Sequence, residues 1–418
     1  MNVYLVGGAV RDQLLNFPVI ERDWVVVGQT PEQMLNMGFK AVGKDFPVFL
    51  HPATHDEYAL ARTERKTAPG YKGFAINAAP GVTLREDLKR RDLTINAMAM
   101  LPDGLLFDPF GGQRDLQAKL LRHVSPAFSE DPVRILRVAR FAARFAHLGF
   151  HIAAETLQLM QQMVQHGEID HLVPERVWAE THKALKEQSP SAYFLALQRC
   201  GALKIIFPEI DQLFGVPQPE QYHPEIDTGI HSLLALEQAA LLTTHAEVRF
   251  AALVHDLGKA CTPARFWPGH HGHETAGLPL LTQLCQRLRV PKQFHKLASR
   301  VMQFHTHCHR SLQLRPSTLV DMLQSLGALK TDRHFSHFLL ACEADAKGRT
   351  GLENKPYPQA DFIRQARQAA ITANFSAMHK HLRGAQIGQA IREQRIKAVQ
   401  SFKQTYASKH KDTSPLSR

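Results

Sequence analysis

The sequence has no run of 18 or more apolar residues, so we predict no membrane-spanning helix. Its first residues hold no apolar core behind a basic start, because Arg11 and Asp12 interrupt them, and we expect no secretory signal. Cysteine is scarce, and the five cysteines are scattered without a Cys-x-x-Cys pair. This pattern argues against a disulfide framework and a structural zinc knot, and it favours a reducing cytoplasm as the compartment.

Acidic residues are scarce in the second half of the chain. Residues 223–418 carry 26 Lys and Arg but 14 Asp and Glu, whereas residues 1–222 carry 24 and 25. This basic excess favours a polyanion such as nucleic acid as the partner, although a generally basic surface explains the charge alone equally well. With 418 residues, 44% of them hydrophobic and 21% charged, the chain has the composition of a globular protein of several domains.

The hydrophobic pattern changes along the chain. Short β-branched runs bounded by glycine predict strands at residues 3–6 and 24–27. From about residue 116 the pattern becomes helical, as at 132–145, 153–165, 174–186 and 191–200. Residues 223–350 are helical and rich in histidine, more helices are expected over 360–404, and the last dozen residues have the composition of a frayed tail.

Two features near the N-terminus suit a nucleotide. Gly7 and Gly8 lie between the first strand and a helix, where backbone N–H groups can reach phosphate, and Arg11 adds a cation one turn later. Glu21 and Asp23, spaced i and i+2 at the second strand, can present two carboxylates on one face, which suits Mg²⁺ that carries nucleotide phosphates. Taken singly, a tight turn and a solvated strand end explain these residues as well.

Three further clusters follow before residue 146. Residues 89–97, KRRDLTINA, place Arg91 and Asp92 at a loop-to-helix junction, where an arginine can face phosphate and a carboxylate can cap a helix. Residues 108–112, DPFGG, predict a turn. Within residues 130–145 no acid follows Asp131, which favours an anion- or base-contacting helix face over a solvated one for Arg134, Arg137, Arg140 and Arg144.

In this order and spacing, GGAVRD, the carboxylate pair, RRDLTINA, the DP turn and EDPVRILRVARF resemble the class II tRNA nucleotidyltransferases of the DNA polymerase β superfamily. The resemblance covers the chain to about residue 400 and implies template-independent addition of CCA to tRNA from CTP and ATP. It implies catalysis through Mg²⁺ held by Glu21 and Asp23, although the family usually has Asp at the position of Glu21. A third carboxylate stays unassigned among Glu64, Asp87 and Asp92.

The same resemblance implies a set of nucleotide contacts. Asp131 and Arg134 are expected to pair with the edge of the incoming base, because their side chains together offer acceptors and donors, and Glu130 is expected to hold them in place. The full set of expected nucleotide-binding residues is Gly8, Arg11, Arg91, Asp92, Glu130, Asp131, Arg134, Arg137 and Arg140.

The histidine-rich region resembles the HD phosphohydrolase superfamily, in which imidazoles and carboxylates on neighbouring helices hold one or two divalent ions. The expected ligands are His231, His255, Asp256 and Asp345, with His255 and Asp256 catalytic, and His273 and His305 are expected at a second metal. His307 and His309 are not, because a spacing of i, i+2 and i+4 cannot share one helix face. Lys259 either contacts phosphate or lies in solvent.

The resemblance implies hydrolysis of 2′,3′-cyclic phosphates, 2′-nucleotides and other phosphoesters in this region, with Ni²⁺, Mn²⁺, Co²⁺ or Mg²⁺. It implies an α+β nucleotidyltransferase head with a polymerase β-like mixed sheet, followed by all-α neck, body, HD domain and tail. The expected segments are a head over 1–115, a neck and body over 116–222, an HD domain over 223–350, C-terminal helices over 351–405 and a flexible tail over 406–418.

Three alternatives stay open: a poly(A) polymerase, an enzyme that adds only C or only A, and an HD phosphohydrolase whose head merely binds nucleotide. The His255-Asp256 pair argues against a poly(A) polymerase, and so does Asp45, which breaks the basic pair that this family shows. Partners are expected to be tRNA, CTP and ATP, with no membrane.

Overall fold

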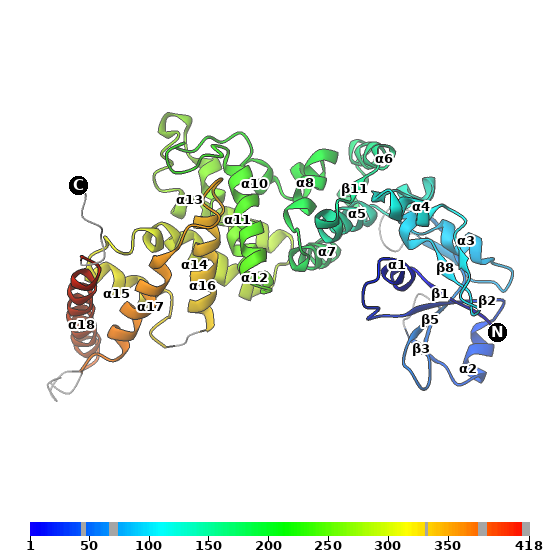
Figure 1. Cartoon of the computed structure of the whole chain (residues 1–418), viewed down its shortest axis with the longest axis horizontal. Coiled ribbons are helices and arrows are strands. Elements are labelled where there is room, and N and C mark those ends of the chain that lie inside the picture. The colour runs from blue at the N-terminus through cyan, green and yellow to red at the C-terminus, as the bar shows by residue number, and fades with distance from the viewer. Residues whose placement is uncertain (43–46, 67–73, 331–332, 375–382, 412–418) are drawn as a thin grey trace. The chain divides into compact units, whose positions relative to one another are not determined.

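The computed structural model describes residues 1–42, 47–66, 74–330, 333–374 and 383–411, and Asp45 therefore lies outside the described residues. The chain divides into two compact units, Met1–Phe207 and Pro208–Arg418 (Figure 1). The described strands all belong to unit 1, whereas unit 2 is built from helices. The expected fold class, an α+β head followed by helical domains, is confirmed.

Unit 1 is built on a seven-stranded mixed sheet in the order β3-β4-β5-β2-β1-β8-β9. The strand β2 runs antiparallel to β1, with Val6 opposite Asp23, and parallel to β5, with Asp23 beside Glu57. The strands of this sheet are β1 (Asn2–Val6), β2 (Asp23–Val27), β3 (Lys40–Val42), β4 (Val48–Leu50), β5 (Glu57–Leu60), β8 (Ala99–Met100) and β9 (Leu106–Phe107). Two small sheets pair β6 (Thr63–Lys66) with β7 (Phe74–Asn77) and β10 (Leu120–Leu121) with β11 (His151–Ile152).

The helices of unit 1 are α1 (Gly8–Leu14), α2 (Pro31–Asn36), α3 (Leu84–Lys89), α4 (Gly112–Gln117), α5 (Val133–Phe145), α6 (Ala154–Gln165), α7 (Pro174–Lys186), α8 (Ser191–Cys200) and α9 (Ala202–Ile206). Among them, α5 to α8 begin and end within one residue of the ranges that the sequence predicts. Short 3₁₀ turns connect several of them, notably η1 (Thr94–Asn96) and η2 (Pro126–Glu130). Helix α5 packs against α7 and α8.

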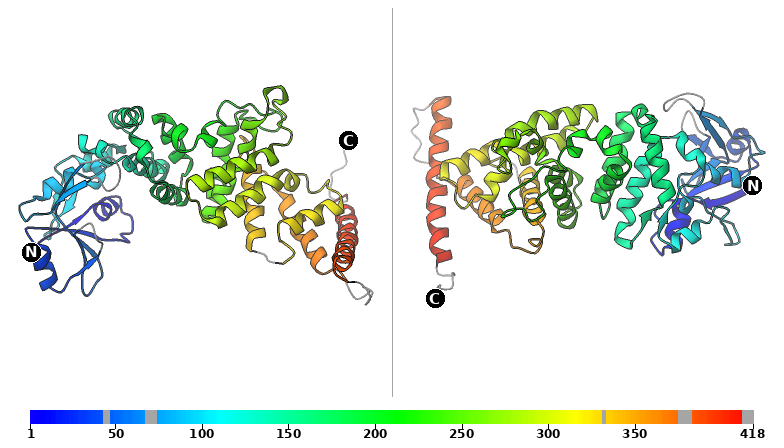
Figure 2. Two further views of the ribbon diagram at one scale, coloured as in Figure 1. Left: turned by 180° about the vertical axis from the view of Figure 1, so that it is seen from behind. Right: turned by 90° about the horizontal axis from the view of Figure 1, so that it is seen from above.

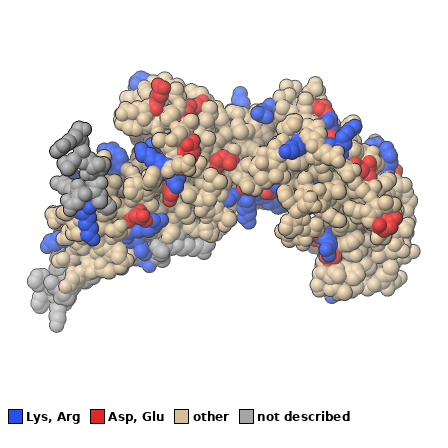
Figure 3. Space-filling view, in the orientation of Figure 1, with Lys and Arg blue, Asp and Glu red and all other residues tan. Residues whose placement is uncertain are grey.

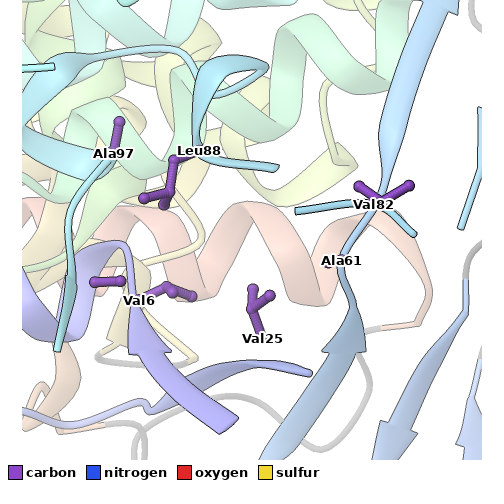
Figure 4. Packing of buried hydrophobic residues seen from close by; sticks show 7 residues of the cluster. Val6, Val25, Ala61, Val82, Leu88 and Ala97 are labelled. Atoms are coloured by element: carbon purple, nitrogen blue, oxygen red, sulfur yellow. The ribbon is translucent and has the colours of Figure 1, made fainter. Parts of the chain in front are cut away.

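The sheet of the head is covered on both faces, because successive residues of a strand point to opposite sides. Val25 packs into one buried cluster, with Val6, Leu88 and Ala97 (Figure 4). Val26 packs into the other, with Met34 and Phe49. Asp23 lies two residues before Val25, so its side chain leaves the strand on the side of Leu88 and Ala97, where α3 and η1 lie.

Unit 2 contains α10 (Pro208–Asp211), α11 (Thr228–Leu242), α12 (Ala246–Val254), α13 (His273–Arg287), α14 (Lys292–His309), α15 (Pro316–Ser325), α16 (Arg333–Lys347), α17 (Pro358–Ile371) and α18 (Ala385–Lys411). The helices α11, α12, α14 and α16 pack against one another as its centre. Helix α18 lies along α15 and α17 (Figure 2). It continues to Lys411, past the expected start of the tail at residue 406, and residues 412–418 lie outside the described residues.

Charged side chains of both signs appear on the face shown in Figure 3, where Lys and Arg are interspersed with Asp and Glu. Among the described residues, no helix is both long and apolar enough to cross a bilayer.

The turn at residues 108–112 has a structural role in the head. Asp108 accepts hydrogen bonds from the backbone N–H groups of Gly112 and Gln113, at 2.7 and 2.9 Å, and thereby caps α4. A Cβ atom at Gly112 would lie 2.3 Å from the carbonyl oxygen of Thr94. Glycine at this position therefore lets α4 pack directly against η1.

We predict that Gly112→Ala lowers the free energy of unfolding by about 1–3 kcal/mol, because the new methyl group overlaps backbone that cannot swing away. Gly81→Ala is the matched control, since nothing lies within 4 Å of its added Cβ atom. Denaturant unfolding followed by circular dichroism measures both variants. Equal stability of the two variants would contradict the close packing of α4 on η1.

Candidate active sites

A polar cavity of about 800 Å³ opens in unit 1 between the sheet, α1 and α5. Ten Arg and Lys side chains and six carboxylates line it, so its wall is positive overall. The cations are Arg11, Arg62, Arg90, Arg91, Arg134, Arg137, Arg140, Arg144, Arg176 and Lys183, and the acids are Glu21, Asp23, Glu57, Glu64, Asp92 and Asp131. Such a wall suits a ligand with several negative charges, which itself carries or meets metal ions.

The predicted carboxylate pair lies in this cavity. Asp23 is the first residue of β2, and Glu21 lies two residues before it, outside the strand. Burial raises the pKa of the Asp23 carboxyl; the Arg91 charge opposes this effect and the Glu21 charge adds to it. The two carboxylates are therefore close enough to repel each other, and such a pair of hard oxygen donors fits a divalent cation.

Glu57 is a third carboxylate that sequence reasoning missed. It begins β5 and lies beside Asp23 in the parallel register, and it also lines the cavity. Glu64, Asp87 and Asp92 were the earlier candidates for this third carboxylate. Asp87 is fully buried and binds Arg90 and Arg91, so it lies beneath the cavity wall. Glu57 lies next to Glu21 and Asp23 because β2 and β5 pair in parallel. No spacing of residues along the chain indicates this proximity.

The turn between β1 and α1 places Gly8 and Arg11 at the cavity. Gly7 has a positive φ of 68°, and a Cβ atom there would lie 2.8 Å from Nη1 of Arg91. Arg11 is buried; its Nη1 donates to Asn96 Oδ1 at 2.5 Å, and its guanidinium lies 5.3 Å from the ring centroids of both Phe141 and Phe145. Arg11 therefore joins α1 to α5 as well as lining the cavity.

Asp92 and Arg137 form an ion pair at the cavity wall. Arg137 Nε donates to Asp92 Oδ2 at 2.7 Å, while Asp92 Oδ1 accepts from the backbone of Leu93 and from Asn96. Burial alone would raise the pKa of Asp92, but Arg137 and these hydrogen bonds hold it well below its usual value. Asp92 therefore binds α5 through Arg137 rather than capping a helix. Arg91 follows Asp87 by one helical turn, and its Nε atom has no hydrogen-bond partner among the described residues.

The predicted base-reading residues are held by the protein itself. Arg176 donates to both carboxylate oxygens of Asp131, at 3.3 and 3.0 Å. Arg134 donates at 2.6 Å to the carbonyl oxygens of Ala127 and Arg90. Arg176 was not foreseen. Glu130, the expected support, ends η2 and is absent from the cavity-lining residues of the described chain.

The arginines of α5 face the cavity rather than bulk solvent. Arg140 is buried and donates to Glu180 of α7 at 2.7 Å, and its guanidinium lies 4.6 Å from the Phe141 ring centroid. Arg144 donates to Asp12 of α1 at 2.9 Å. The four arginines of this helix therefore lie along the cavity wall, and their contact with an anion stays a prediction.

A second cluster of titratable side chains lies at the centre of unit 2. His231 comes from α11, His255 and Asp256 follow α12, and Asp345 comes from α16. His231 Nε2 lies 3.1 Å from Asp345 Oδ1, and His255 Nε2 lies 3.1 Å from Asp256 Oδ2. The four expected ligands are therefore brought together in the fold, and all are buried.

The histidines of this cluster turn Nε2 toward its centre. The Nδ1 atoms of His255, His273 and His305 lie 2.7–3.1 Å from backbone carbonyl oxygens of their own helical turns. Each Nδ1 must therefore carry the proton and donate it to the carbonyl oxygen, which leaves Nε2 with a free lone pair. His255 Nε2 and both oxygens of Asp256 have no partner in hydrogen-bonding geometry among the described residues, as expected of metal ligands.

His273 and His305 join the cluster from α13 and α14. Their Nε2 atoms lie 3.3 and 3.5 Å from Asp256 Oδ1 and 3.4 Å from each other. His309 is a correction to the sequence analysis, because its Nε2 lies 2.6 Å from Asp345 Oδ2. It lies one helical turn after His305, so these two share a face even though His307 does not.

Two further polar residues support the cluster. Lys259 is buried, and its Nζ lies 2.6 Å from Asp256 Oδ2 and 2.5 Å from Gln218 Oε1, so it does not lie in solvent. Glu225 Oε1 lies 2.9 Å from His231 Nδ1, opposite the Nε2 atom that faces Asp345. This carboxylate orients His231, and sequence reasoning missed it because it belongs to a loop without a motif signal.

Residues 3–122 match the Poly A polymerase head domain family, residues 149–214 the family described as a probable RNA and SrmB-binding site of polymerase A, and residues 228–326 the HD domain family. The multifunctional CCA protein of Methylococcus capsulatus is 62% identical over 96% of this chain and 95% of its own length. That of Thioalkalivibrio sulfidiphilus is 60% identical over 96% and 99%.

The fold is also that of a solved structure, a Thermotoga maritima CCA-adding enzyme in complex with tRNA, with a TM-score of 0.61, 21% identity and coverage of 95% of this chain and 87% of the other. The head and the histidine cluster thus define an enzyme that joins a nucleotidyltransferase to an HD domain, two domain types that use divalent metal ions. At this identity over nearly its whole length, the chain belongs to the multifunctional CCA protein family.

We predict that Asp92→Asn destabilises unit 1 by about 1–3 kcal/mol at pH 7, because Arg137, 37% exposed, loses its buried charge partner. The folded-state pKa of Asp92 is depressed, so its stabilisation is fully present above the unfolded-state pKa of about 4 and is lost progressively as the pH falls from there through the lower folded-state pKa. Urea unfolding at pH 7 and pH 3 should therefore show the gap in unfolding free energy between variant and wild type narrowing at the lower pH. The exposed Glu32→Gln is the control, and a gap of the same size at pH 7 and pH 3 would contradict the ion pair.

We predict that Glu225→Gln weakens binding of Ni²⁺ or Co²⁺ to the cluster about 10–100-fold, because the amide holds His231 less firmly than the carboxylate does. Isothermal titration of chelator-treated protein measures the affinity. Glu220→Gln, an exposed neighbour in the same loop, should bind the metal like the wild type. Equal affinity of the two variants would show that Glu225 does not orient the ligand.

Proposed function

We propose that the chain adds CCA to the 3′ end of tRNA without a nucleic-acid template, using CTP and ATP and releasing pyrophosphate. The observation that carries this proposal is the head cavity, which joins the Glu21 and Asp23 carboxylates to a wall with more cations than anions. The 3′-hydroxyl oxygen of tRNA forms a bond to the α-phosphorus of the nucleotide, and its proton passes to water. The bond between the α-phosphorus and the oxygen that bridges to the β-phosphate breaks, and pyrophosphate leaves. The multifunctional CCA proteins to which the chain is about 60% identical support this reading.

Glu21 and Asp23 would hold Mg²⁺, with Glu57 beside them. When bound, Mg²⁺ supplies charge stabilisation for the attacking and leaving oxygens. Gly8 offers backbone at the start of α1, and Arg11 and Arg91 add cations, so that the triphosphate lies with its α-phosphate near the carboxylates.

Asp131 and Arg134 would read the base. A carboxylate accepts from the amino group that both cytosine and adenine carry, and a guanidinium donates to a ring nitrogen or carbonyl oxygen. Because Arg176 and two carbonyl oxygens fix these side chains, the protein presents a preset pattern of donors and acceptors. Arg137 and Arg140 would line the nucleotide further along α5, and Glu130 precedes Asp131 directly.

The HD cluster would act as a metal-dependent phosphohydrolase on 2′,3′-cyclic phosphates, 2′-nucleotides and other phosphomonoesters. Its mixed imidazole and carboxylate donors favour Ni²⁺, Mn²⁺ or Co²⁺, although Mg²⁺ remains a candidate. When bound, such an ion lowers the pKa of water and polarises phosphate. Lys259, held at the cluster by Asp256 and Gln218, offers a cation to the phosphate.

The excess of Lys and Arg after residue 222 would attract the tRNA backbone through charge rather than sequence. The cytoplasm, where tRNA is repaired, is the proposed place of action. The five cysteines are free of disulfides, which suits that reducing compartment.

A gel at single-nucleotide resolution tests the nucleotidyltransferase directly. With tRNA that lacks its 3′ CCA, Mg²⁺ and CTP alone, we expect two added residues, and one more once ATP is present. A long ladder with ATP alone would indicate a poly(A) polymerase. Extension by C only or A only would indicate a partial enzyme, and no extension would leave only the hydrolase.

We predict that Asp23→Ala lowers tRNA extension by about 10³-fold or more, because a ligand of the catalytic ion is lost, while hydrolysis of a 2′,3′-cyclic nucleotide stays near wild type. His255→Ala should give the reverse pattern, so each variant is the folded control of the other. The two rates are measured on the same preparations. Joint loss of both activities in a folded variant would rule out two independent sites.

A further inference from the structure

Three side chains with metal-binding atoms meet in unit 2 outside the HD cluster. His245 precedes α12, Glu247 lies in the first turn of that helix, and His337 comes from α16. One ligand atom from each lies within 4.8 Å of the other two. Two imidazoles and a carboxylate form a donor set that binds Zn²⁺ and related transition metals.

The geometry of this His-Glu-His trio is close to that of a metal site. His337 Nδ1 lies 3.5 Å from Glu247 Oε1, and the ring centroids of His245 and His337 lie 4.4 Å apart. Bonds of about 2.0–2.2 Å to one ion place neighbouring ligand atoms about 3.0–3.5 Å apart, so small side-chain rotations suffice. His337 is buried at 6% exposure, whereas His245 is exposed, which leaves room for water to complete the coordination.

The trio shares no residue with the HD cluster. Ten residues separate His245 from His255 along α12, and eight separate His337 from Asp345 along α16. At a rise of about 1.5 Å per residue these intervals span about 15 and 12 Å. The trio therefore lies about two to three helical turns from the cluster on the same two packed helices, too far to share an ion.

We propose that His245, Glu247 and His337 form a second transition-metal site, which ties the start of α12 to α16. The site takes ions of the Zn²⁺, Co²⁺ and Ni²⁺ class, and it discriminates against Mg²⁺, which prefers oxygen ligands in octahedral geometry. An ion held here binds the folded chain and not the separated helices, so it stabilises unit 2. It also fixes the relative position of the two helices that carry His255, Asp256 and Asp345.

The test uses the full chain, stripped with chelator, and Co²⁺ as the probe. Equilibrium dialysis and visible absorption should show one equivalent of Co²⁺ fewer per chain for His245→Ala than for the wild type. Zn²⁺ should raise the melting temperature less in this variant. His147→Ala, which removes an exposed histidine from unit 1, is the control and should match the wild type in both measurements.

The Asp256→Ala variant, in which the HD cluster lacks a ligand, should still bind Co²⁺ at the trio. Adding His245→Ala to this variant should therefore remove one more equivalent of Co²⁺, which separates the trio from the HD cluster. Glu247→Gln, which keeps the size of the side chain, should weaken Co²⁺ binding by about tenfold or more. Equal Co²⁺ content of His245→Ala and the wild type overturns the proposal. An equal loss in His147→Ala also overturns it, because it would indicate an adventitious ion only.

Discussion

The arginines of α5 impose the constraint on which the head depends. Four cations on one short helix repel one another, and burying them is costly unless each has partners. Each arginine has its own partners in the protein: the carbonyl oxygens of Ala127 and Arg90 for Arg134, Asp92 for Arg137, Glu180 for Arg140 and Asp12 for Arg144. These bonds tie α5 to α1, α7, η2 and the segment after α3, so the neutralisation of one helix also assembles the cavity wall.

In the HD cluster the buried charges are negative instead of positive, and the carboxylates of Asp256 and Asp345 would repel each other. Burial raises the pKa of Asp256 and Asp345, yet His255, together with Lys259 at Asp256 and His309 at Asp345, brings both pKa values well below normal, so both carboxylates stay ionised. Backbone carbonyl oxygens fix the tautomers of the surrounding histidines, which directs the lone pairs inward. The arrangement holds strong negative charge and nitrogen donors at one point, which is costly unless a cation completes it.

Sequence reasoning recovered what short spacing encodes. The strands at Val6 and Asp23, the long helices and the motif residues follow from local periodicity and from resemblance. It missed what only pairing creates: Glu57 reaches Asp23 through a parallel register, and Arg176 reaches Asp131 from another helix. The strands β3 to β7 have three or four residues each, too few for a periodic signal. His309 was set aside because three histidines were judged together, whereas two of them lie one turn apart.

The head site and the HD cluster differ in donor chemistry, and under the proposed function this difference would allow one chain to use two kinds of ion. The head offers carboxylate oxygens at Glu21 and Asp23, which suit Mg²⁺ brought by a nucleotide, whereas imidazole at the HD cluster adds affinity for the later transition metals. A chain with oxygen donors at both sites would bind Mg²⁺ at both, in proportion to its abundance. Under the proposed function, nitrogen donors at one site and oxygen donors at the other would favour different ions. The two chemistries would then respond separately to changes in metal supply.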